Sequence, residues 1–254
     1  SDFREKCFNL IENYLPSPSI NTFGEHNVLR YTEKSIDTAI IQKLARYLSS
    51  LNASRVLLLN GYTQETGVLF RTLDEIDEDI FFLCIPKIDG KYSQVHNDYL
   101  NSFFQEELDN PRNAFLSTQK RPTVSRKKIH ATISNFNKET LNPSDSKENM
   151  RTLSQIYSGY VHGSSVHIIE MVDINSKKYL LRGMLGTSIH NDFIYNYWDY
   201  VYRAIISTML ISKVLGFEQL YIECSKFRKD FEEKTERCGT GDAEVQLKKM
   251  KAKH

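Results

Sequence analysis

The sequence contains few cysteines, and none of them has a spacing that binds metal. They are Cys7, Cys84, Cys224 and Cys238. Isolated cysteines without a CxxC pair are typical of reduced thiols in a cytoplasmic protein. HExxH and ExxH motifs are absent as well, so His162, His167 and His190 are not expected to bind a metal ion.

Long hydrophobic runs are also missing. The longest strongly apolar run is Ala204–Ile211, which Ser207 and Thr208 interrupt. It is much shorter than the roughly 20 residues that a membrane-spanning helix needs. The first residues lack the charged start, apolar stretch and small-residue cleavage site of a signal peptide. We therefore expect a cytoplasmic protein that makes no contact with membranes.

The common cofactor loops are absent. The sequence contains no GxxxxGK[ST] or GxGxxG loop for nucleotides and no GxSxG elbow of a serine hydrolase. No cofactor is therefore expected. An excess of one charge is missing too, because 33 Lys and Arg residues balance 32 Asp and Glu residues. This balance argues against a dedicated binder of duplex DNA but leaves room for a local basic patch.

One interior stretch is locally basic. Its cationic residues are Lys120, Arg121, Arg126, Lys127 and Lys128. Such a run beside a cleft would attract a phosphate backbone and is a candidate nucleic-acid-binding site. A solvated linker between helices explains the same composition, and charge runs are more often of that kind.

The periodicity of apolar residues predicts helices along most of the chain. The expected helices cover 3–15, a segment from near Ser35 to a break around Asn52, 54–84, 94–108, 192–215 and 217–237. Prolines at 16, 18, 86 and 111 are expected to end the helices that precede them. The runs 166–172 and 178–185 are rich in Ile, Val, Tyr and Leu, which is typical of a β-hairpin. The sequence thus predicts a mainly α, single-domain bundle of long antiparallel helices over 1–240, a small hairpin insert around 166–185, and a disordered basic tail over 241–254.

The most informative motif is the stretch 157–164, Tyr-Ser-Gly-Tyr-Val-His-Gly-Ser. Tyr157 and Tyr160 continue a helical apolar stripe, and Gly163 can take the left-handed conformation that ends a helix. His162 therefore stands at a helix end. Its ordinary pKa near 6.5 suits a general acid or base, although helix-terminal histidines often only interact with the last carbonyls. Tyr157 is a candidate catalytic acid, with a core aromatic role as the alternative.

A second motif lies on the predicted helix 54–84. Arg71 and Glu75 are one helical turn apart, so their side chains can pair. Glu75 would then orient the planar guanidinium of Arg71 toward a phosphate or carboxylate. An ordinary exposed pair, worth about 0.3–0.5 kcal/mol, explains the spacing equally well.

Together, the two motifs resemble a known family. The stretch from Asn60 to Glu75 and the stretch 157–164 are similar to two hallmarks of a bacterial all-helical family of uncharacterised domains. These hallmarks are an Arg-Ser/Thr-Leu-x-Glu helix and a helix ending in His-Gly-Ser or His-Pro-Ser. The likeness covers about 35–215. It implies a helical fold like that of the HEPN ribonuclease domains and a setting in phage defence.

The resemblance leaves two functions open. In the first, the chain is a defence-associated, metal-independent ribonuclease that forms a homodimer and acts on RNA. His162 then transfers the proton of the 2′-hydroxyl, and Arg71 stabilises the charge on the phosphate. In HEPN nucleases, four to six residues separate an arginine from the histidine that follows it. That spacing is absent here, because only three residues lie between Arg126 and His130. In the second, the domain is a non-catalytic sensor or adaptor that binds a partner protein of a defence system. Its motif residues then only hold the helices together.

Overall fold

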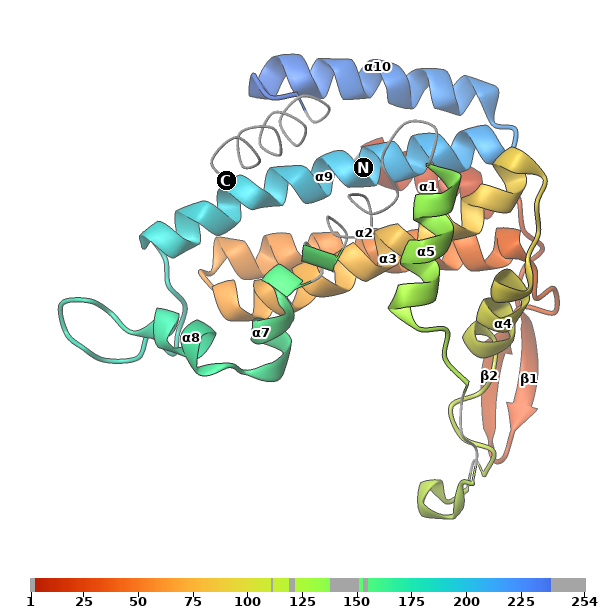
Figure 1. Ribbon diagram of the computed structural model, residues 1–254, viewed down its shortest axis with the longest axis horizontal. Coiled ribbons are helices and arrows are strands. Elements are labelled where there is room, and N and C mark those ends of the chain that lie inside the picture. Colours follow the sequence, from red (N-terminus) through yellow and green to blue (C-terminus); the bar gives the residue numbers. More distant parts are fainter. Residues whose placement is uncertain (1–2, 111, 119–121, 138–150, 153–154, 239–254) are drawn as a thin grey trace.

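Three long helices form the centre of the computed structural model, which describes residues 3–110, 112–118, 122–137, 151–152 and 155–238. They are α2 (Ile36–Leu59), α3 (Thr63–Asp89) and α9 (Ser188–Val214). Helix α1 (Phe3–Glu12) packs on α2 and α9, and α10 (Glu218–Thr235) packs along α9 (Figure 1). Short connections at 60–62 and 215–217 make α2 antiparallel to α3 and α9 antiparallel to α10. The predicted mainly α bundle is confirmed.

Smaller elements surround these helices. They are β1 (Ser19–Phe23), β2 (His26–Arg30), α4 (Gln94–Phe103), η1 (Ala114–Leu116), α5 (Arg126–Phe136), α7 (Ser158–His162), α8 (Ser165–Ile168) and η2 (Ile169–Met171). The two strands pair antiparallel, with Ser19 opposite Arg30 and Phe23 opposite His26. Helices α5 and α7 both pack on α3. Helices α7 and α8 lie at the end of the bundle where α9 begins (Figure 1).

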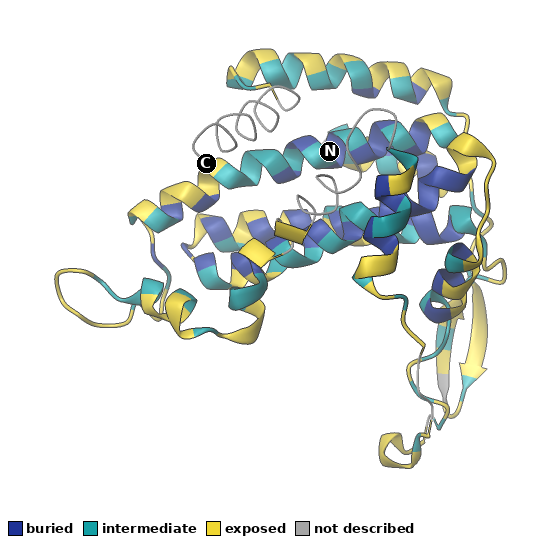
Figure 2. Cartoon of the chain, viewed as in Figure 1, coloured by how far each residue is buried: buried dark blue, intermediate teal, exposed yellow. Residues whose placement is uncertain are grey.

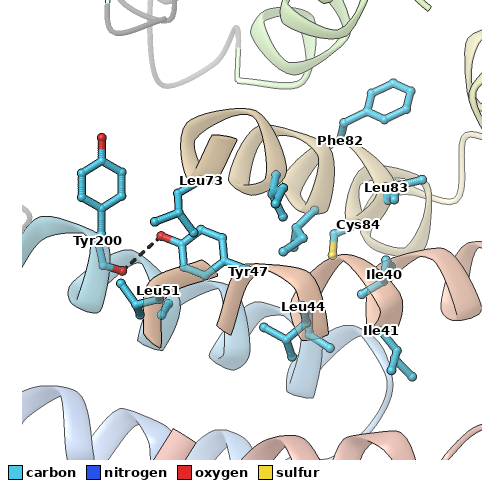
Figure 3. Close-up of a cluster of buried hydrophobic side chains, with 14 of the residues drawn as sticks. Ile40, Ile41, Leu44, Tyr47, Leu51, Leu73, Phe82, Leu83, Cys84 and Tyr200 are labelled. Atoms are coloured by element: carbon cyan, nitrogen blue, oxygen red, sulfur yellow. Dashed lines mark hydrogen bonds between the residues drawn. The ribbon is translucent and has the colours of Figure 1, made fainter. Parts of the chain in front are cut away.

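The hydrophobic core lies where α2, α3 and α9 face one another (Figure 2). Its largest fully buried side chains include Tyr47, Phe70 and Phe82. The hydroxyl of Tyr47 donates a 3.1 Å hydrogen bond to the carbonyl oxygen of Tyr200, so this buried polar group has a partner (Figure 3). Helix α2 begins as predicted, because the Thr38 N–H donates to Ser35 Oγ at 3.2 Å.

The boundary between the first two long helices differs from the prediction. The expected break near Asn52 is absent, and α2 continues to Leu59. The chain turns instead at Gly61, whose φ of 76° is costly for residues with a Cβ. The long helix therefore begins at Thr63, and not near Ser54.

Pro86 was expected to end α3, but it does not. The helix runs on to Asp89 and closes at Gly90, which has a φ of 70°. A proline inside a helix leaves the carbonyl four residues earlier without its N–H donor. Here that carbonyl belongs to Phe82, and His96 Nε2 lies 3.3 Å from it. A side chain of α4 thus replaces the missing helical bond.

The β-hairpin lies elsewhere than predicted. The two-stranded sheet is formed by 19–30, whereas 166–185 begins with α8 and η2. Only one antiparallel bridge, between Val172 and Tyr179, remains of the expected hairpin there. The apolar residues that suggested strands are largely exposed, so no buried sheet face selects that pairing. The predicted tail, 241–254, lies outside the described residues.

Candidate functional site

Arg71 and Glu75 form the pair that their spacing predicts. Arg71 Nη2 lies 2.6 Å from Glu75 Oε1. The Arg71 side chain is 16% exposed, whereas that of Glu75 is 43% exposed. The other terminal nitrogen of Arg71, Nη1, is buried and has no hydrogen-bond partner within the described part of the chain. The guanidinium is thus held on one side and keeps a free donor on the other.

His162 is the last residue of α7, and its side chain is exposed. Gly163 follows with φ 59° and ψ 46°, which is the left-handed helix end that the motif predicts. Among the described residues, no hydrogen bond or ion pair joins His162 to Arg71. The two residues that resemblance suggested as catalytic partners are therefore not linked directly.

The rest of the 157–164 motif forms a helix junction. A Cβ on Gly67 of α3 would lie 2.6 Å from Cγ of Tyr160, so α7 crosses α3 in direct contact with its backbone. The Tyr160 hydroxyl donates a 2.7 Å hydrogen bond to Glu170 Oε2. Ser164 Oγ lies 2.6 Å from His167 Nδ1, and Gln64 Nε2 donates to the His167 carbonyl at 2.8 Å. These contacts attach α8 to the first turn of α3.

Tyr157 lies in the core. Its ring makes an edge contact with Phe70 at 5.4 Å between centroids, and its exposure is only 9%. The Tyr157 hydroxyl accepts a 3.3 Å hydrogen bond from Asn196. Burial raises the pKa of Tyr157 to about 12, so the phenol keeps its proton at neutral pH. This position suits the aromatic core role that the sequence left open.

A buried ionic cluster joins α3 to α9. Arg203 Nη1 lies 2.5 Å from Asp74 Oδ1, and Ser207 Oγ donates a 2.6 Å hydrogen bond to Asp77 Oδ1. Burial raises the pKa of Asp74 to about 6, although the nearby Arg203 guanidinium acts in the opposite direction. Arg203 thus pairs with Asp74 and also interacts electrostatically with Asp77. Such a cluster fixes how two helices are rotated against each other.

A second ionic cluster joins α3 to α5 and also reaches α2 and α4. Arg126 pairs with Asp79 and, at 3.1 Å, with Glu78 Oε2. His130 Nε2 lies 2.8 Å from the same Glu78 oxygen. Lys43 Nζ and the Tyr99 hydroxyl both contact Asp79 Oδ2, at 2.7 Å and 2.8 Å. The carboxylates of Glu78 and Asp79 therefore already have hydrogen-bond and ion-pair partners within the protein.

The predicted basic run is divided by the structure. Arg126 turns inward to the cluster just described, whereas Lys127 and Lys128 on α5 are exposed. Lys120 and Arg121 lie outside the described residues. Among the described residues of the run, Lys127 and Lys128 in the first turn of α5 are thus the exposed cations.

Sequence reasoning missed Asp74, Asp77 and Arg203 as a group. A signal was present, because Asp74 stands beside Leu73 and Ile76 in an apolar stripe, and Arg203 interrupts the apolar run of α9. Charged residues at core positions need a partner, which is the physical rule that would have found them. The rule does not say which partner, and here Asp74 and Arg203 are 129 positions apart.

Searches with this chain against protein-family models, curated proteins and solved structures gave no significant match. No helix in the described ranges is apolar enough over sufficient length to cross a membrane. Across the same ranges, no three His, Cys, Asp or Glu side chains are grouped in a way that could hold a metal ion.

Proposed function

We propose that this chain is a non-catalytic helical interaction module, in which the motif residues hold the helices together. The observation that carries the proposal is an exposed apolar surface at the α7–α8 end of the bundle. We call it the apolar end, and its members are Val166, Ile169, Ile174, Tyr179, Leu181 and Leu185. Each of these residues is between 51% and 76% exposed. Clusters of exposed large apolar residues mark protein interaction sites.

The candidate catalytic residues support this proposal. Arg71 is paired with Glu75, Tyr157 is buried among aromatic rings, and Arg126 is held by two carboxylates. An active site needs its groups to meet where a substrate can reach them. In this protein, Tyr157 and Arg126 instead connect neighbouring segments to α3, whereas Arg71 and Glu75 pair within α3 itself.

A photoreactive amino acid at position 181 tests the proposal in cells that make the protein. We expect irradiation to give a discrete covalent adduct whose second component is identified by mass spectrometry. A probe at position 222, an apolar residue of α10 that is 53% exposed, is the matched control and should give no such adduct. A probe at 181 that crosslinks to nothing would refute the interaction module.

A second function, cleavage of RNA, is favoured by one specific observation. Arg71 Nη1 is a buried donor without a partner within the described residues, and α7, which carries the exposed His162, crosses α3 at Gly67, one turn away. An arginine with a free donor can bind a phosphate, and a nearby histidine can transfer a proton. No metal ion is needed, because the 2′-hydroxyl of the RNA supplies the nucleophile.

Incubation of purified protein with cellular RNA tests this second function. His162→Ala and Arg71→Ala should each lower the cleavage rate by roughly 100-fold or more. Val161→Ala changes an exposed neighbour on the same helix and should cleave as the wild type does. Intact RNA after incubation with the wild-type protein would exclude the ribonuclease.

A further inference from the structure

We propose that the apolar end is the surface through which two copies of this chain associate. The inference rests on the proposed interaction function and adds the identity of the partner. Three properties support it: the attachment of these residues to the bundle, their exposed area and the charges in the same segment.

The segments that carry the apolar end are attached to the first turn of α3 and the turn before it. The Met184 N–H donates a 2.7 Å hydrogen bond to the carbonyl of Gly61, which fixes the segment before α9 to the turn between α2 and α3. Gln64 fixes α8 to the first turn of α3 through the His167 carbonyl. Between them, the Leu180 N–H donates to the Met171 carbonyl at 2.8 Å. The backbone of 166–185 is therefore attached near the beginning of α3 at both of its ends.

The exposed area suits a stable interface. From their exposed fractions, the six residues of the apolar end present on the order of 700 Å², close to the ~800 Å² that each partner contributes to a standard interface. A surface of this size and composition is costly to leave in water.

The surrounding charges are self-complementary. The segment 165–192 contains three acidic residues (Glu170, Asp173, Asp192) and three basic residues (Lys177, Lys178, Arg182). Lys177 and Lys178 are exposed near Tyr179, and Glu65 is exposed on the first turn of α3. Lys177 already interacts electrostatically with Asp173 of its own chain, whereas no ion pair of Lys178 or Glu65 is present within the described residues.

The mixture of acidic and basic residues favours a second copy of the chain over an anionic lipid surface. In a two-fold dimer, each contact between two positions occurs twice, so basic residues of one copy can face acidic residues of the other. An anionic lipid surface would instead favour an excess of basic residues around the apolar side chains. A second copy of the chain therefore fits the charge balance better than a membrane does.

Sedimentation velocity of the purified full chain tests the proposal. From about 1 to 100 μM, we expect the wild type to sediment with twice the mass of the chain. Leu181→Asp and Ile174→Asp should each raise the dissociation constant by about 100-fold, because the change enters a two-fold interface twice. Ile222→Asp, on the exposed side of α10, should remain dimeric.

A second variant probes the surrounding charges without removing apolar contact. The double variant Lys177→Glu/Lys178→Glu should raise the dissociation constant by about 10-fold at low salt and less at high salt. If an aspartate variant fails to fold, this double variant still tests the proposed dimer. A wild type that is monomeric throughout the concentration range, or variants that dimerise as well as the wild type, would overturn the proposal.

The outcomes also separate this inference from the proposed function. A monomeric protein whose probe at 181 still crosslinks to a different protein in cells would remain an interaction module, but not one that pairs with itself. A protein that neither dimerises nor crosslinks would lose both.

Discussion

The His96 ring supplies a hydrogen bond to the carbonyl of Phe82, the one that Pro86 leaves without its helical donor. His96 Nε2 lies 3.3 Å from this oxygen, and its ring stacks on that of Phe82 with 4.3 Å between centroids. On its other side, His96 Nδ1 lies 2.8 Å from Ser93 Oγ and accepts from the Ser93 N–H. The neutral imidazole satisfies both contacts, because one nitrogen donates and the other accepts.

Acidification should therefore weaken the fold through His96. Burial lowers the pKa of His96, so the unfolded chain binds a proton more readily than the folded one. This contribution to stability is present above the ordinary histidine pKa of about 6.5 and is lost as pH falls through that value. The free energy of unfolding, measured with urea at pH 7 and at pH 5, should fall less for His96→Gln than for wild type. Equal losses would contradict this role of His96.

The contact between Gly67 and Tyr160 should make Gly67→Ala destabilising. Alanine is favoured over glycine inside a helix by about 1 kcal/mol. The added methyl would, however, meet the Tyr160 ring at 2.6 Å, and overpacking costs about 1–3 kcal/mol. We expect a net loss of up to about 2 kcal/mol in the free energy of unfolding. In a Tyr160→Ala background, the same change should become stabilising, and a loss of equal size in both backgrounds would refute the contact.

Arg126 and Lys127 are neighbours on α5 with opposite expected effects. Arg126→Ala leaves Glu78 and Asp79 with fewer partners in a largely buried site, so we expect a loss of about 2–4 kcal/mol in the free energy of unfolding. Lys127→Ala changes an exposed side chain and should stay within about 0.5 kcal/mol. Chemical denaturation measures both. Equal stability of the two variants would mean that the α3–α5 cluster does not hold the fold.

Asp74 should give the protein a measurable pH dependence. Its pKa rises from 3.8 to about 6 on folding, so the folded chain holds this proton more tightly than the unfolded chain. As pH rises from about 4 to about 6, wild type should lose about 3 kcal/mol of stability relative to Asp74→Asn. Asp192→Asn, at an exposed position, serves as the control and should follow the wild type. A wild type that tracks Asp74→Asn across this range would contradict the raised pKa.

Patterns among neighbouring residues predicted a helix boundary correctly where that boundary depends on those neighbours alone. The spacing of Ile36, Ile40 and Leu44 and the cap at Ser35 are contained in a few neighbouring residues, and α2 begins where they predict. Gly163 likewise ends α7 with the expected left-handed conformation. The break expected near Asn52 and the stop expected at Pro86 were wrong. In the second case, a distant histidine supplies what the proline removes.

The sequence alone thus determined that the chain is mainly helical, where α1, α2, α4 and α10 begin, and that Arg71 and Glu75 share one helical face, because these depend on residues three or four positions apart. Only the tertiary structure decided which charges meet. The rotation and packing of whole helices bring Arg203 to Asp74 across 129 positions and place Arg126 on Glu78 and Asp79. The same packing buries Tyr157, leaves His162 exposed without a bond to Arg71 among the described residues, and gathers apolar side chains of 166–185 on the surface.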